Sequence, residues 1–163
     1  MERKKHTPYR FQEGQEKDVL VRLERYCAYT ERCEFDVIRK LKSWQVPESY
    51  FDEAIQYLKD QNYIREERYG EQFARGKFRL KSWGRQKIRA KLREKNVDDN
   101  IIESSLEEID EQEYINRLNQ LMEARYSRIK EEDNYTARAK LYQYAFQKGY
   151  ESSLIIKWLD HHL

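Results

Sequence analysis

Residues 84–109 read GRQKIRAKLREKNVDDNIIESSLEEI, and the pattern in this stretch decides the fold. Apolar residues recur through it at close to helical spacing, at positions 88, 92, 97, 102, 106 and 109. Asn96 can end a first helix in a left-handed conformation, and Asp98 can cap the first turn of a second helix. The stretch therefore predicts two amphipathic helices joined by a short link.

The same apolar pattern occurs twice more in the chain. With a shift of 51 residues, these six apolar positions and Ile115 align with Val37, Leu41, Val46, Phe51, Ile55, Leu58 and Ile64. With a shift of 53 residues, Ile88, Val97, Ile101, Ile102 and Leu106 align with Leu141, Tyr150, Leu154, Ile155 and Leu159. A period of this length indicates one helical unit that is stacked several times. We therefore expect an all-α fold of three tandem three-helix repeats in an elongated, curved array.

The chain divides by composition into a polar start and three repeats. Residues 1–15 contain Pro8 and Gly14 and show no periodicity, so they are expected to form a flexible tail. The expected repeats are 16–64, 65–110 and 111–163. In the second repeat the helices are expected at 66–80, 83–95 and 98–109, and in the third at 111–129, 135–147 and 151–159. Gly149 suits the left-handed position that ends a helix.

Composition excludes several protein classes. Apolar residues make up 39% of the chain and charged residues 38%, a mixture that favours thin amphipathic helices with much exposed surface. Five glycines and two prolines are too few for a turn-rich all-β protein. Cys27 and Cys33 are interpreted as reduced thiols. No apolar run is long enough to span a bilayer and the first residues lack a signal-peptide pattern, so a soluble cytoplasmic protein is expected.

Motifs of catalysis and metal binding are absent from the sequence. Gly70, Gly76 and Gly84 are isolated within segments that are expected to be helical, so they form no phosphate-binding loop. No Cys-x-x-Cys or His-Glu-x-x-His spacing occurs, and the adjacent His161 and His162 have poor geometry for one metal ion. We therefore expect no enzyme activity, no catalytic residue, no metal and no cofactor.

The most informative charges lie between residues 75 and 95, where Glu94 is the single acid. The ten basic residues of this segment, which we call the basic block, are Arg75, Lys77, Arg79, Lys81, Arg85, Lys87, Arg89, Lys91, Arg93 and Lys95. Three arginines, at 85, 89 and 93, form one row beside the apolar seam of their helix, and lysines 87 and 91 lie on its other flank. Like charges at this spacing repel, so they require a counter-charge.

Two sources of that counter-charge remain open. One is an external anionic partner, such as a phosphate backbone or an acidic protein surface, and the basic block is then the partner-binding or DNA-binding site. The other is internal pairing with the acids that follow in the sequence, although exposed pairs are worth at most about 1 kcal/mol each. These acids are Asp98, Asp99, Glu103, Glu107, Glu108, Asp110, Glu111 and Glu113.

Sequence-specific reading of the DNA major groove is disfavoured by charge. Tandem helix-turn-helix units would insert their second helices into the groove, but the segments 48–60 and 98–109 are acidic. A possible secondary site lies in the third repeat, where Arg125, Arg128, Arg138 and Lys140 alternate with Tyr126, Tyr135, Tyr142 and Tyr144. Such alternation can bind single-stranded nucleic acid, but tyrosines at helical spacing more often pack between helices.

Three short motifs resemble those of the RecX family. Residues 62–69, NYIREERY, are similar to the signature that joins its first and second repeats. The run from GRQKI (84–88) to LREKNV (92–97) resembles the middle of its second repeat. FQKGY (146–150), followed by Ile155, resembles the end of its third repeat. Glu66, Gly70 and Asn96 depart from the usual residues of the family.

The resemblance implies a modulator of the RecA recombinase. Members of this family associate with the RecA–DNA filament and suppress ATP hydrolysis, strand exchange and co-protease activity, and they have no catalytic residues. The expected partners are therefore the RecA filament and single- or double-stranded DNA, bound directly or through RecA, with no membrane. A monomer is expected. The alternative is a helical module that binds DNA without sequence specificity and without RecA.

Overall fold

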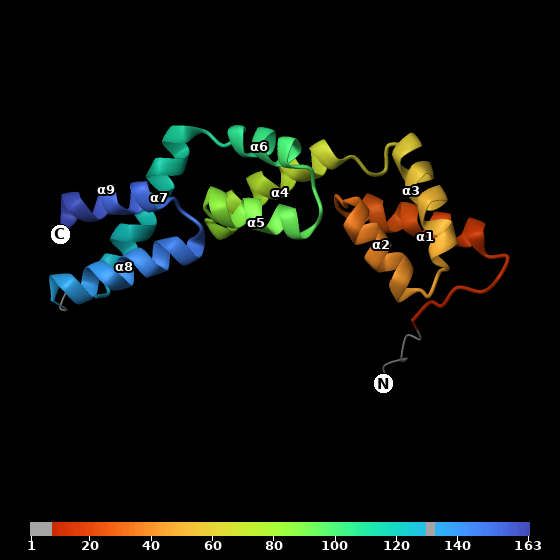
Figure 1. Ribbon diagram of the computed structural model, residues 1–163, viewed down its shortest axis with the longest axis horizontal. Helices are drawn as coiled ribbons and strands as arrows, with labels where there is room; N and C mark the ends of the chain where they lie inside the picture. The colour runs from red at the N-terminus through yellow and green to blue at the C-terminus, as the bar shows by residue number, and fades with distance from the viewer. Residues whose placement is uncertain (1–7, 130–132) are drawn as a thin grey trace, which may run out of the picture. The chain divides into compact units, whose positions relative to one another are not determined.

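The computed structural model describes residues 8–129 and 133–163. Within these ranges it contains nine α-helices, one short 3-10 helix (Glu48–Tyr50) and no β-strand (Figure 1). The α-helices are α1 (Glu16–Tyr29), α2 (Glu34–Ser43), α3 (Phe51–Asp60), α4 (Glu66–Lys81), α5 (Arg85–Glu94), α6 (Asp99–Glu107), α7 (Glu111–Tyr126), α8 (Asn134–Lys148) and α9 (Ser152–His162). The all-α prediction is confirmed. The chain forms two compact units that divide between Tyr69 and Gly70. The three-repeat boundaries and the curved array remain predictions.

The link between the second and third helices has the same backbone conformation in all three repeats. Gln45, Asn96 and Gly149 have positive φ angles of 60°, 58° and 96°. Two positions further on the chain is extended in each copy, with ψ of 137°, 139° and 136° at Pro47, Asp98 and Glu151. The left-handed positions predicted at Asn96 and Gly149 are confirmed, and Gln45 is the third. The repeat found in the apolar pattern is therefore also a repeat of the backbone.

The first unit has its own apolar core, formed by α1, α2 and α3. Its fully buried side chains include Val19, Leu23, Val37, Leu41, Ala54 and Leu58. Two residues of the expected tail contact this core: the ring of Tyr9 lies edge-on to Trp44 at 5.4 Å, and the N–H of Phe11 donates to the carbonyl of Trp44 at 2.8 Å. Residues 1–7 of that expected tail lie outside the described residues.

Both cysteines are buried and free in the first unit. Burial disfavours the thiolate and raises the pKa of Cys27 to about 11 and that of Cys33 to about 12. Cys33 also has a structural role, because it precedes α2 and forms a capping box with Asp36. The interpretation of these residues as reduced thiols agrees with this environment.

The first turn of α4 is tied to the first unit by polar contacts. Glu66 accepts a hydrogen bond from the N–H of Glu34 at 2.9 Å. Arg68 pairs with Glu31 at 2.7 Å and donates to the carbonyl of Asn62 at 3.1 Å. These residues belong to the stretch that follows α3, so the NYIREERY motif serves to anchor the start of α4.

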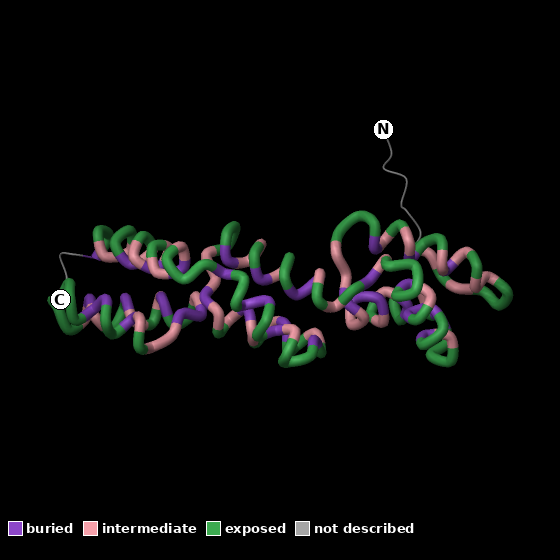
Figure 2. The backbone as a smooth tube through the Cα atoms, turned by 90° about the horizontal axis from the view of Figure 1, so that it is seen from above, coloured by how far each residue is buried: buried purple, intermediate pink, exposed green. Residues whose placement is uncertain are grey.

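The second unit contains the rest of α4 and the helices α5 to α9. Helix α5 packs against α6, and α8 packs against both α7 and α9 (Figure 1). Buried segments recur along these helices, as expected for amphipathic elements (Figure 2). Ile88 and Leu92, the predicted seam of α5, have no exposed surface. Other fully buried side chains of this core are Ile102, Tyr114, Met122, Leu141 and Ile155.

The backbone at the start of α5 forms hydrogen bonds with the backbone at the end of α8. The N–H of Gly84 donates to the carbonyl of Lys148 at 2.8 Å, and the N–H of Gln86 donates to the carbonyl of Gly149 at 3.0 Å. The N–H of Arg85 is satisfied by the hydroxyl of Tyr114 at 2.9 Å. Gly84 was expected inside a helix, but it is the residue before α5, because this contact requires an extended backbone there.

Within the described ranges, none of the helices combines the length and the apolar composition needed to cross a membrane.

Candidate partner-binding surface

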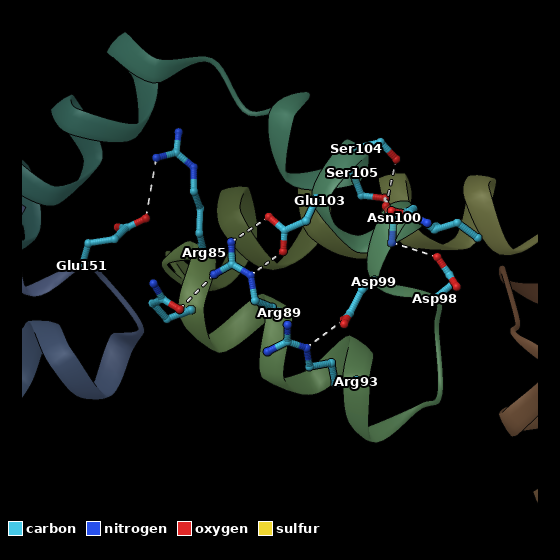
Figure 3. A network of polar contacts seen from close by, with 12 residues as sticks. Arg85, Arg89, Arg93, Asp98, Asp99, Asn100, Glu103, Ser104, Ser105 and Glu151 are labelled. Atoms are coloured by element: carbon cyan, nitrogen blue, oxygen red, sulfur yellow. Dashed lines mark hydrogen bonds and ion pairs between the residues drawn. The ribbon is translucent and has the colours of Figure 1, made fainter.

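The three arginines of the basic block that lie on α5 form ion pairs within the second unit (Figure 3). Arg89 binds both carboxylate oxygens of Glu103 on α6, at 2.6 and 2.9 Å. Arg93 pairs at 2.8 Å with Asp99, at the start of the same helix. Helix α6 thus supplies acidic partners for α5. Internal pairing, one of the two sources of counter-charge that the sequence left open, occurs for these arginines.

The third arginine of the row, Arg85, lies over the aromatic ring of Tyr114 on α7. Its guanidinium carbon is 3.9 Å from the ring centroid, and its side chain is only 18% exposed. It pairs with Glu111 at 2.5 Å and with Glu151 at 3.7 Å. The hydroxyl of Tyr114 donates to Glu151 at 2.7 Å. Arg85 therefore belongs to a network that holds α5, α7 and the start of α9 together, and it is not a free surface charge.

The pairing of Arg89 with Glu103 changes the titration of both groups. The hydrogen bonds from Arg89 hold the pKa of the Glu103 carboxyl below its ordinary value. The same contact raises the pKa of Arg89. Glu103 is about half exposed, so its pair contributes at most about 1 kcal/mol to stability.

Four lysines of α4, α5 and α8 have no ion pair within the described residues. We call this group, Lys77, Lys81, Lys87 and Lys148, the lysine surface. Lys77 and Lys87 hold their ammonium groups 5.1 and 4.7 Å from the centroid of the Trp83 ring. Lys148, from α8, donates to the carbonyl of Lys81 at 3.3 Å. Lys77, Lys81 and Lys87 belong to the predicted basic block, but Lys148 does not. It lies 67 residues from Lys81 in the chain and reaches it only through the α5–α8 contact.

The other members of the basic block are dispersed. Arg75 is exposed on α4. Arg79 approaches Glu113 at 3.8 Å, and Lys91 pairs with Glu94 at 2.8 Å on its own helix. Lys95 also has an interaction partner. The ten residues therefore do not form one continuous positive surface.

The possible secondary site in the third repeat is largely engaged in packing. Arg138 pairs with Asp160, and Arg125 lies 5.4 Å from the centroid of Tyr144. Lys140 has a partner, whereas Arg128 is exposed. Among the tyrosines, Tyr126 packs edge-on against Trp158, Tyr142 hydrogen-bonds with Ser152, and only Tyr135 is strongly exposed, at 86%. Most of these side chains thus make contacts within the second unit, and the secondary site remains a prediction.

No cluster of three or more metal-ligating side chains occurs in the part of the chain that the structure describes.

Comparison with known proteins agrees with this architecture. The model of the second three-helix domain of RecX matches residues 66–106, and the model of its third three-helix domain matches residues 111–159. Together these matches cover more than half of the chain. The chain belongs to the RecX family. The first match contains α5 and all but the last residue of α6, and the second contains α7, α8 and most of α9.

Similar RecX proteins occur in several bacteria. The regulatory protein RecX of Clostridium beijerinckii is 34% identical over 77% of this chain and 59% of its own length. That of Clostridium perfringens strain 13 is 32% identical over 75% of this chain and 58% of its own length. The chain thus spans about three fifths of the length of these relatives. Because they are regulatory proteins, family membership supports the prediction that the chain is not an enzyme.

Two crystal structures of RecX proteins have the same fold. One covers 91% of this chain and 74% of its own, with a TM-score of 0.82 and 22% identity. The other, RecX from Lactobacillus salivarius, covers 90% of this chain and 97% of its own, with a TM-score of 0.78 and 25% identity. The expected all-α fold of three-helix RecX domains is thereby confirmed.

Proposed function

We propose that this RecX protein binds the RecA nucleoprotein filament in the cytoplasm and inhibits its recombinase, ATPase and co-protease activities, thereby modulating DNA repair and recombination. The observation that carries this proposal is the match of two consecutive three-helix domains to RecX. Helices with exposed basic and acidic faces also suit a partner that is itself a repeating assembly of protein and DNA.

The test is the ATPase activity of the cognate RecA on single-stranded DNA. Adding the protein at sub-stoichiometric to equimolar amounts should lower the rate of ATP hydrolysis. An unrelated helical protein of similar net charge is the control for nonspecific competition. An unchanged rate over the whole range would refute the proposal.

A second candidate function, direct binding of DNA without RecA, is favoured by the lysine surface. Its four ammonium groups have no carboxylate partner within the described residues, in contrast to the arginines of α5. Lysines of this kind can displace counterions from phosphates, which makes affinity fall with salt by a slope of about 0.7 to 0.9 for each contact. We therefore place the phosphate contacts at these lysines and not at the arginine row.

Charge removal separates the two functions. The double variant Lys81→Gln/Lys148→Gln should weaken DNA binding and make it less salt-dependent. The control Lys17→Gln/Lys42→Gln removes two exposed lysines from the first unit and should leave DNA binding unchanged. If the lysine-surface variant binds DNA like the unmodified protein, direct binding is not carried by this surface. RecA inhibition is measured on the same variants, so the first proposed function is tested independently of DNA binding.

A further inference from the structure

An exposed aromatic ring and a lysine share a pocket at the contact between α5 and α8. The pocket has a volume of about 430 Å³, and its lining includes Gln86, Lys87, Phe146, Glu151 and Ser152. Phe146 is 57% exposed. Its ring is therefore available to a ligand.

Neighbouring side chains hold this ring and this lysine in place. The ring of Tyr142 stacks on that of Phe146, with centroids 5.8 Å apart and an interplanar angle of 13°. Lys87 donates to the carbonyl of Gln147 at 3.4 Å while its ammonium group lies over Trp83. Lys87 thus belongs both to the pocket and to the lysine surface. The two features form one continuous site within the second unit.

The one acid in the pocket is already engaged. One carboxylate oxygen of Glu151 accepts the hydrogen bond from Tyr114, and the other lies 3.7 Å from Arg85. The N–H groups of Gly84 and of the first two residues of α5 are also satisfied, by Lys148, Tyr114 and Gly149. The Oε1 of Gln86 accepts a hydrogen bond from Arg89, and the hydroxyl of Ser152 shares one with Tyr142. The Lys87 ammonium and the side-chain NH₂ of Gln86 retain hydrogen-bond donors for a ligand. The pocket therefore offers an aromatic face, a cation and hydrogen-bonding groups.

We propose that this pocket binds an unpaired base of single-stranded nucleic acid, with Phe146 stacking on the base and Lys87 contacting the adjacent phosphate. Every nucleobase has a flat face that stacks on an aromatic ring, so the site needs no sequence specificity. Bases of a duplex are stacked on one another and cannot enter a recess on the protein. The site thus selects single strands, and the rest of the lysine surface contacts the backbone beyond the pocket. The inference rests on the second proposed function, direct binding of nucleic acid.

Variants of Phe146 test the stacking role. Binding of a fluorescent oligo(dT) of about 20 nucleotides is measured by anisotropy for Phe146→Ala, Phe146→Leu and Phe146→Tyr, and circular dichroism melting verifies that each variant folds. The alanine and leucine variants should weaken binding about fivefold or more, because both remove the aromatic face. The tyrosine variant keeps the face and should bind like the unmodified protein. Tyr29→Ala, which removes an exposed ring from the end of α1, is the control and should have no effect.

The charge of Lys87 is tested by salt titration. Lys87→Gln should lower the slope of log affinity against log salt by roughly 0.7 for single strands. Lys157→Gln, which removes an exposed lysine from α9, should leave the slope unchanged. A duplex of the same length should compete more weakly than the single strand.

The outcomes distinguish failure of the pocket from failure of either function. Salt-dependent binding of oligo(dT) that is unaffected by Phe146→Leu would overturn the pocket and leave direct DNA binding intact. Equal competition by the duplex would also overturn it. An unmodified protein that does not bind oligo(dT) at low salt would overturn both the pocket and direct binding. Inhibition of RecA ATPase, measured separately, decides the first proposed function alone.

Discussion

A Cβ atom on Gly84 would lie 2.3 Å from the carbonyl carbon of Gly149, and one on Gly149 would lie 2.4 Å from the Cβ of Lys87. The start of α5 and the end of α8 therefore approach at a distance that only glycines allow. Gly149 also has a φ of 96°, which disfavours other residues. This contact joins parts of the chain that belong to two different predicted repeats.

Gly84→Ala should destabilise the protein by about 1–3 kcal/mol, because the new methyl group forces α5 and α8 apart. The free energy of unfolding is measured by urea denaturation. Gly76→Ala is the control, since a Cβ there meets nothing within 4 Å in the interior of α4. The free energy of unfolding of that variant should be higher by about 0.5–1 kcal/mol. Equal stability of Gly84→Ala and the unmodified protein would show that the two helices do not meet in this way.

Tyr114→Phe should cost about 1–3 kcal/mol, because it leaves the N–H of Arg85 without its acceptor and removes the hydrogen bond to Glu151. Tyr150→Phe is the matched control. Tyr150 is only 1% exposed, and its hydroxyl has no hydrogen-bond partner within the described residues. Its loss should be neutral or stabilising. Thermal unfolding of both variants measures the difference, and similar effects would argue against a special role of the Tyr114 hydroxyl.

Gln45→Gly should stabilise the first unit by up to about 1 kcal/mol, because glycine adopts the left-handed conformation without strain. Replacing Ser43, the last residue of α2, with glycine should lower the free energy of unfolding, since glycine weakens a helix. Urea denaturation of the two variants gives both signs in one experiment. A loss of stability with Gln45→Gly would contradict the left-handed backbone at this position.

Glu103→Gln should lower stability by up to about 1 kcal/mol at neutral pH and have no effect in strong acid. The pKa of Glu103 is lowered in the folded protein, so the stability that its carboxylate contributes is fully present above the unfolded pKa of 4.5. It is lost as the pH falls through the folded value. Melting temperatures at pH 7 and pH 2.5 measure this difference. Glu107→Gln, on the same helix and without an ion pair in the described ranges, is the control and should not lower the melting temperature at pH 7.

The helices and their links were predictable because they depend on local patterns. The four-residue spacing of Ile88 and Leu92 identified the buried face of α5, and both residues are fully buried. Asp98 accepts a hydrogen bond from the N–H of Asn100 at 2.8 Å, as its predicted capping role requires. Gln45 was missed, because glutamine rarely adopts a left-handed conformation.

The state of the charges was not predictable from their spacing. Arg85, Arg89 and Arg93 look like a solvent-facing row, yet their carboxylate partners lie on α6, α7 and the start of α9. Which arginines are neutralised depends on how these helices pack. Lys77 and Lys87 lie over the ring of Trp83, and Lys148 donates to the carbonyl of Lys81. None of these lysines has a carboxylate within ion-pair distance among the described residues.

The sequence by itself determined the helical repeat, the left-handed positions at Asn96 and Gly149, and the resemblance to RecX. These follow from spacing and local backbone preference, which act over a few residues. The tertiary structure alone decided which basic residues are available to a partner. It pairs Arg89 with Glu103 and brings Lys148 and Phe146 beside α5, because contacts between distant segments form only when the amphipathic faces of the helices pack together.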